Sequence, residues 1–240
     1  MIEAFFWGAV GASALLVGAL VAYVATPSPK IIGVVMALGA GLLIGSVAFE
    51  LIDEALKTAE VALVGLFTLI GAATFTVGDW WLERGGAGDR KDSGGAQASG
   101  APLAIVFGSV LDGVPESFVL GLTVLQGGVS VALLVGVLLS NLPEGLSSSS
   151  GLRVAGWSRA RVVRMWLIVM LVAGVSAALG YALLDPASGR TGAFAQGFAA
   201  GALLAMITDT MLPEAYAVER VATGSLVAIG FAISLMLSAV

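Results

Sequence analysis

The chain carries a related five-residue motif twice, as Asp112-Gly-Val-Pro-Glu116 and as Ser140-Asn-Leu-Pro-Glu144, at an offset of 28 residues. Each copy lies near the middle of an apolar run that is long enough to span a bilayer, which takes about 20 residues. A carboxylate at the centre of such a helix costs about 2.5–3.5 kcal/mol on insertion scales, so carboxylates there are functional candidates. Three carboxylates at helical spacing, with a proline inside each motif, indicate a cation site within the membrane.

The composition indicates an integral membrane protein. Hydrophobic residues make up 58% of the 240 residues and charged residues 11%, with a mean hydropathy of +1.02, whereas about a quarter of the residues in soluble domains are charged. The net charge of −5 argues against a nucleic-acid partner. The chain has no cysteine and no histidine, which excludes disulfides, thiolate metal sites and imidazole chemistry.

The spacing of apolar runs predicts an all-α membrane protein with eight transmembrane helices in one domain, 1–240. The predicted spans are 4–25, 31–53, 61–82, 102–125, 129–151, 162–184, 192–215 and 222–240. The Gly/Ser/Ala-rich segment 83–101 predicts a flexible cytoplasmic linker. The spans thus form a 3+2+3 arrangement.

Basic residues predict the orientation of the chain. With the N-terminus outside, nine basic residues fall in inner loops and two in outer loops, as the positive-inside rule requires. The inner set is Lys30, Arg84, Arg90, Lys91, Arg153, Arg159, Arg161, Arg164 and Arg220, and the outer set is Lys57 and Arg190. We therefore expect both termini outside, in a prokaryotic plasma (inner) membrane, with the lipid bilayer as a partner. The sequence is compatible with a homodimer.

The second and seventh spans repeat each other at an offset of 160 residues. Ala40-Gly-Leu-Leu43 corresponds to Ala200-Gly-Ala-Leu203, and Glu54-Ala55 corresponds to Glu214-Ala215. The predicted topology makes these two spans cross in opposite directions, and the same holds for the fourth and fifth. Inverted repeats with a site at their interface are typical of secondary transporters. Small residues also recur by chance in helical bundles, but the match of acidic positions favours a true repeat.

The two motifs supply an oxygen-only set of donors. Residues four apart share a helix face, so Asp112 stacks with Glu116 and Ser140 with Glu144, while Asn141 flanks the same site. The proline of each motif frees a carbonyl one turn earlier. Such oxygens suit hard or borderline divalent cations. A kinked helix with a protonated, hydrogen-bonded glutamate is the alternative for either motif alone.

Together the paired motifs, the 3+2+3 order, the outward termini and the Leu-Pro-Glu-Ala end of the seventh span resemble the ZIP family of divalent metal transporters over essentially the whole chain. In that family the fourth span reads His-Asn-x-Pro-Glu and the fifth His- or Gln-x-x-Pro-Glu-Gly, and these residues build a metal centre that is often binuclear. The resemblance implies a primary metal site at Asp112, Glu116, Ser140 and Glu144, with Asn141 beside it.

Three departures from the family pattern change the expected site. Gly113 stands where the family has Asn, residues 165–184 contain no acid for a second metal, and the linker has no histidine. We therefore expect one metal site and no permanent cofactor. Without imidazole, the donors are compatible with Mn, Fe or Mg ions and with unselective uptake that includes Zn and Cd ions.

Five further acids flank the predicted site along the chain. Glu50, Asp53 and Glu54 fall near the outer end of the second span, Asp209 lies deep in the seventh span, and Glu214 lies near its inner end. We interpret them as an entry and exit pathway. For Asp53, Glu54 and Glu214, an interfacial position in water is an equal alternative.

Three classes of function are compatible with these features of the sequence. The first is transport of a divalent metal toward the cytoplasm, and the second is a non-transporting ZIP-like protein that acts as a metal sensor or scaffold. The third is an intramembrane hydrolase with paired carboxylates. We expect no enzyme, because the acids recur beside prolines rather than in a Gly-rich aspartyl motif and no nucleophile–base pair is visible. Metal flux into proteoliposomes separates the first two classes.

Overall fold

The structure, a computed structural model, describes residues 1–25, 27–82, 84, 102–182 and 189–239. Within these residues the chain forms eight helical segments and no strand, and seven of the segments are long and apolar enough to cross a membrane. The helices therefore indicate an integral membrane protein. The predicted linker 83–101 lies outside the described residues, apart from Arg84.

Six of the segments are single helices. They are α1 (Ile2–Val24), α4 (Val61–Leu82), α5 (Pro102–Gln126), α6 (Val131–Val154), α7 (Arg159–Ala182) and α10 (Ala222–Ser238). The last of them, α10, has 17 residues and is the shorter apolar helix. Both motif prolines lie inside continuous helices, Pro115 in α5 and Pro143 in α6. Each predicted span corresponds to one observed segment.

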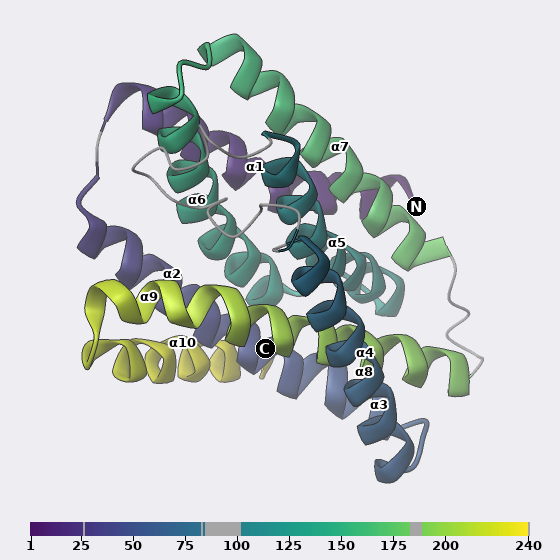
Figure 1. The fold of residues 1–240 in the computed structure, drawn as a ribbon. Helices are drawn as coiled ribbons and strands as arrows, with labels where there is room; N and C mark the ends of the chain where they lie inside the picture. The colour runs from purple at the N-terminus through teal and green to yellow at the C-terminus, as the bar shows by residue number, and fades with distance from the viewer. Residues whose placement is uncertain (26, 83, 85–101, 183–188, 240) are drawn as a thin grey trace.

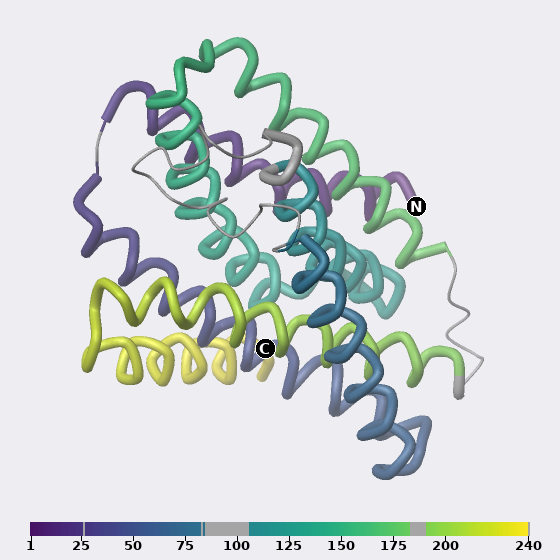
Figure 2. The backbone as a smooth tube through the Cα atoms, in the orientation of Figure 1, coloured from purple at the N-terminus to yellow at the C-terminus, as the bar shows by residue number. Residues whose placement is uncertain are grey.

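Two segments contain a π-helical turn at corresponding positions. The first is α2 (Pro29–Ser46), η1 (Val47–Ile52) and α3 (Asp53–Leu56), and the second is α8 (Gly189–Met206), η4 (Ile207–Met211) and α9 (Leu212–Glu219). The backbone runs through both turns without a break (Figure 2). The turns begin at residues 47 and 207, so they are 160 residues apart, which is the offset of the sequence repeat. Single π-turns inside α-helices are frequent at functional sites.

Serine caps fix the starts of two helices. The Oγ of Ser28 accepts a hydrogen bond from the backbone N–H of Ile31 at 3.4 Å, and Pro29 follows it as the first residue of α2. The Oγ of Ser130 likewise accepts from the N–H of Leu133 at 3.0 Å at the start of α6. These caps explain why α2 and α6 begin where they do.

The helices pack in two groups (Figure 1). In one group α1 packs against α6 and α7, and α5 packs against α7. In the other group α2 packs against α10, and α4 packs against α8. Contacts between α2 and α6 join the two groups. The motif helices α5 and α6 thus belong to the same group.

Pairs of glycines form the closest contacts within each group. A Cβ atom on Gly18 of α1 would clash with the carbonyl oxygen of Leu142 on α6, and one on Gly145 of α6 would clash with the carbonyl oxygen of Leu15 on α1. Small residues allow helix backbones in membranes to approach in this way. The other pairs are Gly121 and Gly180 between α5 and α7, Gly41 and Gly230 between α2 and α10, and Gly71 and Gly201 between α4 and α8.

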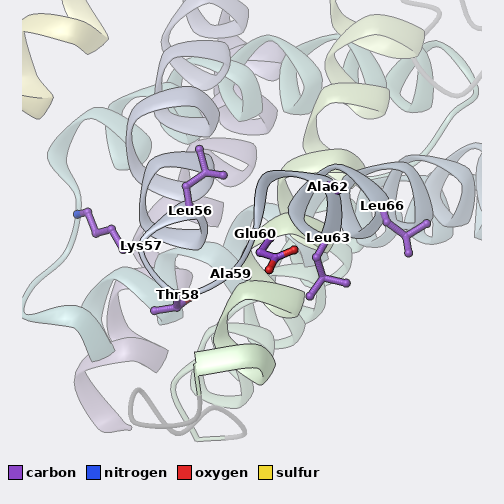
Figure 3. Close-up of a pocket in the computed structure, with 8 residues that line it drawn as sticks. All are labelled: Leu56, Lys57, Thr58, Ala59, Glu60, Ala62, Leu63 and Leu66. Atoms are coloured by element: carbon purple, nitrogen blue, oxygen red, sulfur yellow. The ribbon is translucent and has the colours of Figure 1, made fainter.

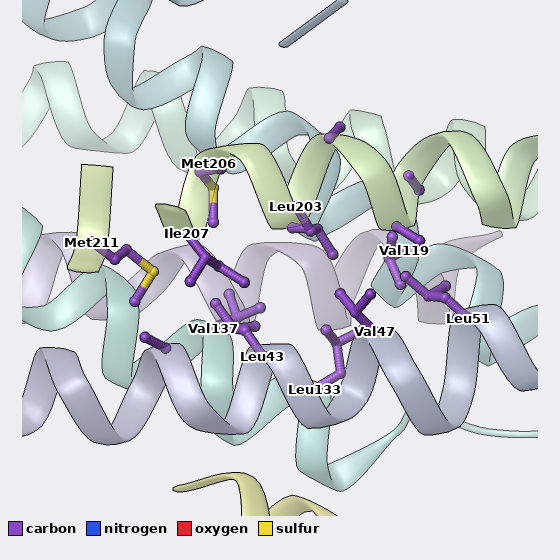
Figure 4. Packing of buried hydrophobic residues seen from close by; sticks show 14 of the residues in the cluster. Leu43, Val47, Leu51, Val119, Leu133, Val137, Leu203, Met206, Ile207 and Met211 are labelled. Carbon is purple, nitrogen blue, oxygen red and sulfur yellow. The ribbon is translucent and has the colours of Figure 1, made fainter. Parts of the chain in front are cut away.

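A large apolar cluster fills the space between α2, α5, α6 and α8 (Figure 4). Side chains from all four helices meet there, and they include Leu43, Val47, Val119, Leu133, Val137, Leu203, Met206 and Ile207. A second cluster packs α1 against α7 around the fully buried Trp166. The first cluster borders the predicted cation site.

Candidate cation site

The five residues of the predicted metal site are all buried between helices. The exposed fraction is 4% for Asp112, 2% for Glu116, 6% for Ser140, 3% for Asn141 and 6% for Glu144. The first two belong to α5 and the other three to α6. Burying a carboxylate to this extent is costly unless donors or a cation compensate its charge.

Two serine hydroxyls connect the glutamates of α5 and α6. The Oγ of Ser140 on α6 lies 3.0 Å from Oε1 of Glu116 on α5 and 2.9 Å from the carbonyl oxygen of Val137, so its single hydrogen is shared between these two acceptors. Ser109 of α5 donates from Oγ to Oε1 of Glu144 on α6, at 2.7 Å. Ser109 is itself only 2% exposed. Each buried glutamate is therefore held by a hydroxyl of the opposite helix.

The two hydroxyl–carboxylate pairs lie at different depths. Ser140 and Glu144 are four residues apart on α6, which is about 6 Å along the helix axis. Among the described residues, no group of three or more acidic, histidine or cysteine side chains is placed to hold a metal ion together. The convergence of Asp112, Glu116 and Glu144 on one cation therefore stays a prediction.

Asn141 connects α6 to α1 and borders a small cavity. Its Nδ2 donates a hydrogen bond to the carbonyl oxygen of Gly11 at 3.2 Å. The cavity, of about 10 Å³, is lined in part by Gly113, Ser117 and Asn141. A Cβ atom on Gly113 would meet no atom within 4 Å. The space is at the lower limit for one water molecule.

Glu50 is half-buried in η1 and joins three helices. Its Oε1 accepts a hydrogen bond from the hydroxyl of Ser130, at the start of α6. The hydroxyl of Ser238, near the end of α10, lies 3.4 Å from the same oxygen and 2.9 Å from the carbonyl oxygen of Ser234, so it shares its hydrogen between the two. Its Oε2 is buried and accepts no hydrogen bond from the residues that the structure describes.

Asp53 and Glu54 lie on the surface with Lys57. The ammonium of Lys57 lies 3.5 Å from a carboxylate oxygen of Asp53 and 2.7 Å from one of Glu54. The hydrogen bond from Lys57 to Glu54, together with the charge of Glu54, raises the pKa of Lys57 above its usual range. The side chain of Asp53 is 64% exposed. This arrangement favours the interfacial alternative for both acids over a role in the pathway.

The two acids of the seventh span differ from each other. Asp209 is exposed on η4, and Thr76 of α4 donates a hydrogen bond from Oγ1 to its Oδ2 at 3.5 Å. Glu214 is half-buried in α9. Neither is as buried as Glu116 and Glu144 are.

An apolar barrier separates Glu50 from the buried carboxylates. Along α6 the order is Ser130, which bonds Glu50, then Leu133 and Val137, and then Ser140, which bonds Glu116. The ten residues from Ser130 to Ser140 span about 15 Å. Leu133 and Val137 belong to the apolar cluster of Figure 4, so apolar side chains occupy this face of α6 between the two serines.

A larger cavity lies away from these carboxylates. It measures about 710 Å³ and is lined by Leu56, Lys57, Thr58, Ala59, Glu60, Ala62, Leu63 and Leu66, around the turn between α3 and α4 (Figure 3). It contains none of the five predicted metal ligands. Its cation, Lys57, is already paired with Asp53 and Glu54.

The sequence pattern does not single out Ser109 or Ser130, although both bond a carboxylate. Ser109 precedes Asp112 by three residues and so lies on the same face of α5. This spacing could have identified it as a neighbour of the predicted site. The bond from Ser130 to Glu50 joins residues 80 positions apart, so no pattern within one helix predicts it.

The fold and the site together define a polytopic helical membrane protein with acidic residues buried between two of its spans. No family model matches the chain, and a search of curated proteins finds no match. The resemblance to ZIP transporters therefore rests on the motifs and on the order of the spans.

Proposed function

We propose that this protein transports a divalent metal cation of the Zn, Fe, Mn and Cd class toward the cytoplasm, through a carboxylate site between α5 and α6, as ZIP transporters do. The observation that carries the proposal is the pair of buried glutamates, Glu116 and Glu144, each held by a hydroxyl of the opposite helix. Hydroxyl donors compensate a buried carboxylate in the absence of a cation, and a divalent cation can replace them while it takes the carboxylates as ligands.

The position of Asp112 along α5 supports a single cation site that it shares with Glu116 and Glu144. It follows Ser109 by three residues on α5 and precedes Glu116 by four, so it lies between the two hydroxyl–carboxylate pairs along the helix axis. A cation at this level is about one helical turn from each pair. Side-chain rotation of Glu116 and Glu144, with Ser140 and Asn141 assisting, then completes an oxygen-only site.

The helix contacts support inverted repeats in a ZIP-like 3+2+3 arrangement. The contact of α1 with α6 corresponds to that of α7 with α5, and the contact of α2 with α10 corresponds to that of α8 with α4. Each of these four contacts contains a reciprocal glycine pair. The two π-turns also correspond. Repeats of this kind place a substrate site at their interface and allow access to alternate between the two sides.

The test is metal uptake by purified protein in proteoliposomes, with Mn, Fe, Zn, Cd and Mg ions compared. Glu116→Gln and Glu144→Gln should each lower uptake at least tenfold, which corresponds to about 1.4 kcal/mol. Glu60→Gln, a change to an exposed acid, is the matched control and should leave uptake unchanged. If Glu116→Gln and Glu144→Gln took up metal as well as Glu60→Gln and the wild type, this site would be excluded. Metal binding without flux would instead support the sensor or scaffold alternative.

A further inference from the structure

An apolar pocket of about 100 Å³ opens between the end of α1, the first two turns of α2 and the middle of α6. Every residue that lines it is aliphatic or proline. Its walls include Val21 of α1, Ile31, Ile32 and Val35 of α2, and Pro143 and Leu146 of α6. The pocket is distinct from the hydroxyl–carboxylate pairs, although Pro143 and Leu146 flank Glu144 in the sequence.

The position of the pocket makes a lipid chain its natural occupant. The three helices that line it are all long enough to cross a membrane, and Ile31 at its edge is 60% exposed. Val35 lies six residues after the start of α2 at Pro29, or about 9 Å deeper along the helix. Water does not fill a hollow without polar partners. The available molecules at this depth are acyl chains, in the part that lies just below the headgroup.

Two basic residues lie at the same ends of these helices. Lys30 is exposed in the first turn of α2, and Arg153 is exposed in the last turn of α6. Arg153 uses one nitrogen, Nη1, to donate to the carbonyl oxygen of Ala22 at 2.6 Å, which leaves further N–H donors of its guanidinium for another acceptor. Within the described ranges, neither residue forms an ion pair with a carboxylate. Such uncompensated cations at a membrane surface attract anionic headgroups.

We propose that this pocket is a binding site for an anionic phospholipid, with the upper part of one acyl chain between α1, α2 and α6 and the phosphate beside Lys30 and Arg153. The bound lipid contacts the proline of the second motif. The site is independent of any metal, so its test does not depend on the proposed transport.

Photo-crosslinking in nanodiscs tests the acyl-chain part. Phosphatidylglycerol with a diazirine near the carbonyl end of one chain should label peptides from α1, α2 and α6 that line the pocket. Ile32→Trp, which fills the pocket from its half-buried wall, should lower this labelling severalfold. Leu69→Trp is the matched control, because it adds the same bulk at a side chain of α4 that is 70% exposed. Labelling of the pocket peptides that is equal in both variants would overturn the proposal.

Lipid competition tests the headgroup part. Wild-type protein should prefer phosphatidylglycerol to phosphatidylcholine in native mass spectrometry, and Lys30→Gln should lower that preference about fivefold. Lys57→Gln, which removes a cation beyond the other end of α2, should leave the preference unchanged. A preference that survives Lys30→Gln, or that Lys57→Gln lowers equally, would overturn the assignment of the phosphate to this end.

Discussion

Ser109 and Ser140 have the same role on opposite helices, and each gives a buried glutamate a neutral donor. A hydroxyl is a modest compensation for a carboxylate, because it offers a single donor hydrogen and brings no charge. The pairs can therefore hold the glutamates in place and still release them to a stronger ligand. A lysine or arginine in either position would form an ion pair with the glutamate, which would hinder the exchange with a divalent ion that we propose.

Replacing either serine should destabilise the protein. In Ser109→Ala and Ser140→Ala a buried carboxylate loses its hydroxyl donor, which costs about 1–3 kcal/mol, and the melting temperature in detergent should fall accordingly. The control is Ser176→Ala, because Ser176 is also buried but donates to a carbonyl oxygen, that of Val114, at 2.9 Å. Its loss should cost about 1 kcal/mol. Equal melting temperatures for the three variants would show that the carboxylate contacts carry no extra stability.

At the scale of the elements, η1 links two helices that are distant in the sequence. Through Glu50, this π-turn bonds the start of α6 and the end of α10. The bond to Ser130 is coupled to a helix cap, because the same hydroxyl accepts from the N–H of Leu133. The start of α6 thus depends on the position of η1.

Removing the Ser130 hydroxyl should therefore cost more than the loss of an ordinary cap. Ser130→Ala loses both the cap and the bond to Glu50, whereas Ser28→Ala loses only the cap of α2. Loss of a cap costs about 0.5–2 kcal/mol. We expect a lower melting temperature for Ser130→Ala than for Ser28→Ala. The reverse order would contradict a stabilising role for the bond to Glu50.

The glycine pairs make a second prediction at this scale. Gly41→Ala places a Cβ atom against the carbonyl oxygen of Val227 on α10, and such overpacking costs about 1–3 kcal/mol. Gly65→Ala in α4 is the matched control, because nothing lies within 4 Å of its Cβ position, and it should stabilise the helix by about 0.5–1 kcal/mol. Thermal unfolding of both variants measures the difference. A Gly41→Ala protein as stable as the wild type would show that α2 and α10 do not pack this closely.

At the scale of the whole molecule, the predicted orientation is open to a direct test, because the chain has no cysteine. Thr58→Cys places a thiol in the turn between α3 and α4, and Ser158→Cys places one between α6 and α7. A membrane-impermeant maleimide should label Thr58→Cys in intact right-side-out vesicles and Ser158→Cys only after the vesicles are opened. The opposite pattern would invert the topology and place both termini inside.

The number and positions of the helices can be predicted from the sequence, whereas the specific contacts between side chains cannot. Apolar runs, bounded by proline, glycine and charged residues, locate the eight segments, and the largest difference at a helix end is four residues, between the predicted 215 and the observed Glu219. The i, i+4 rule correctly places Asp112 and Glu116 together on buried α5. It does not predict that Ser140 bonds Glu116 across the helices instead of serving Glu144 on its own helix. That pairing depends on the stagger of two antiparallel helices, which no local pattern encodes.

The helix pairing also has a consequence for the time course of biosynthesis. The described glycines of α1, α2 and α4 whose added Cβ would contact another element all meet residues beyond position 110, so each of these helices depends on the second half of the chain. Gly18 meets Leu142, about 120 residues later, and a ribosome that adds about 5–20 residues per second needs roughly 6–25 s to supply that partner. During this interval the glycine-containing faces of the first three helices contact lipid, because their partner helices have not yet been synthesised. A chain that stops after α4 never covers those faces, which makes it a natural substrate for membrane quality-control proteases.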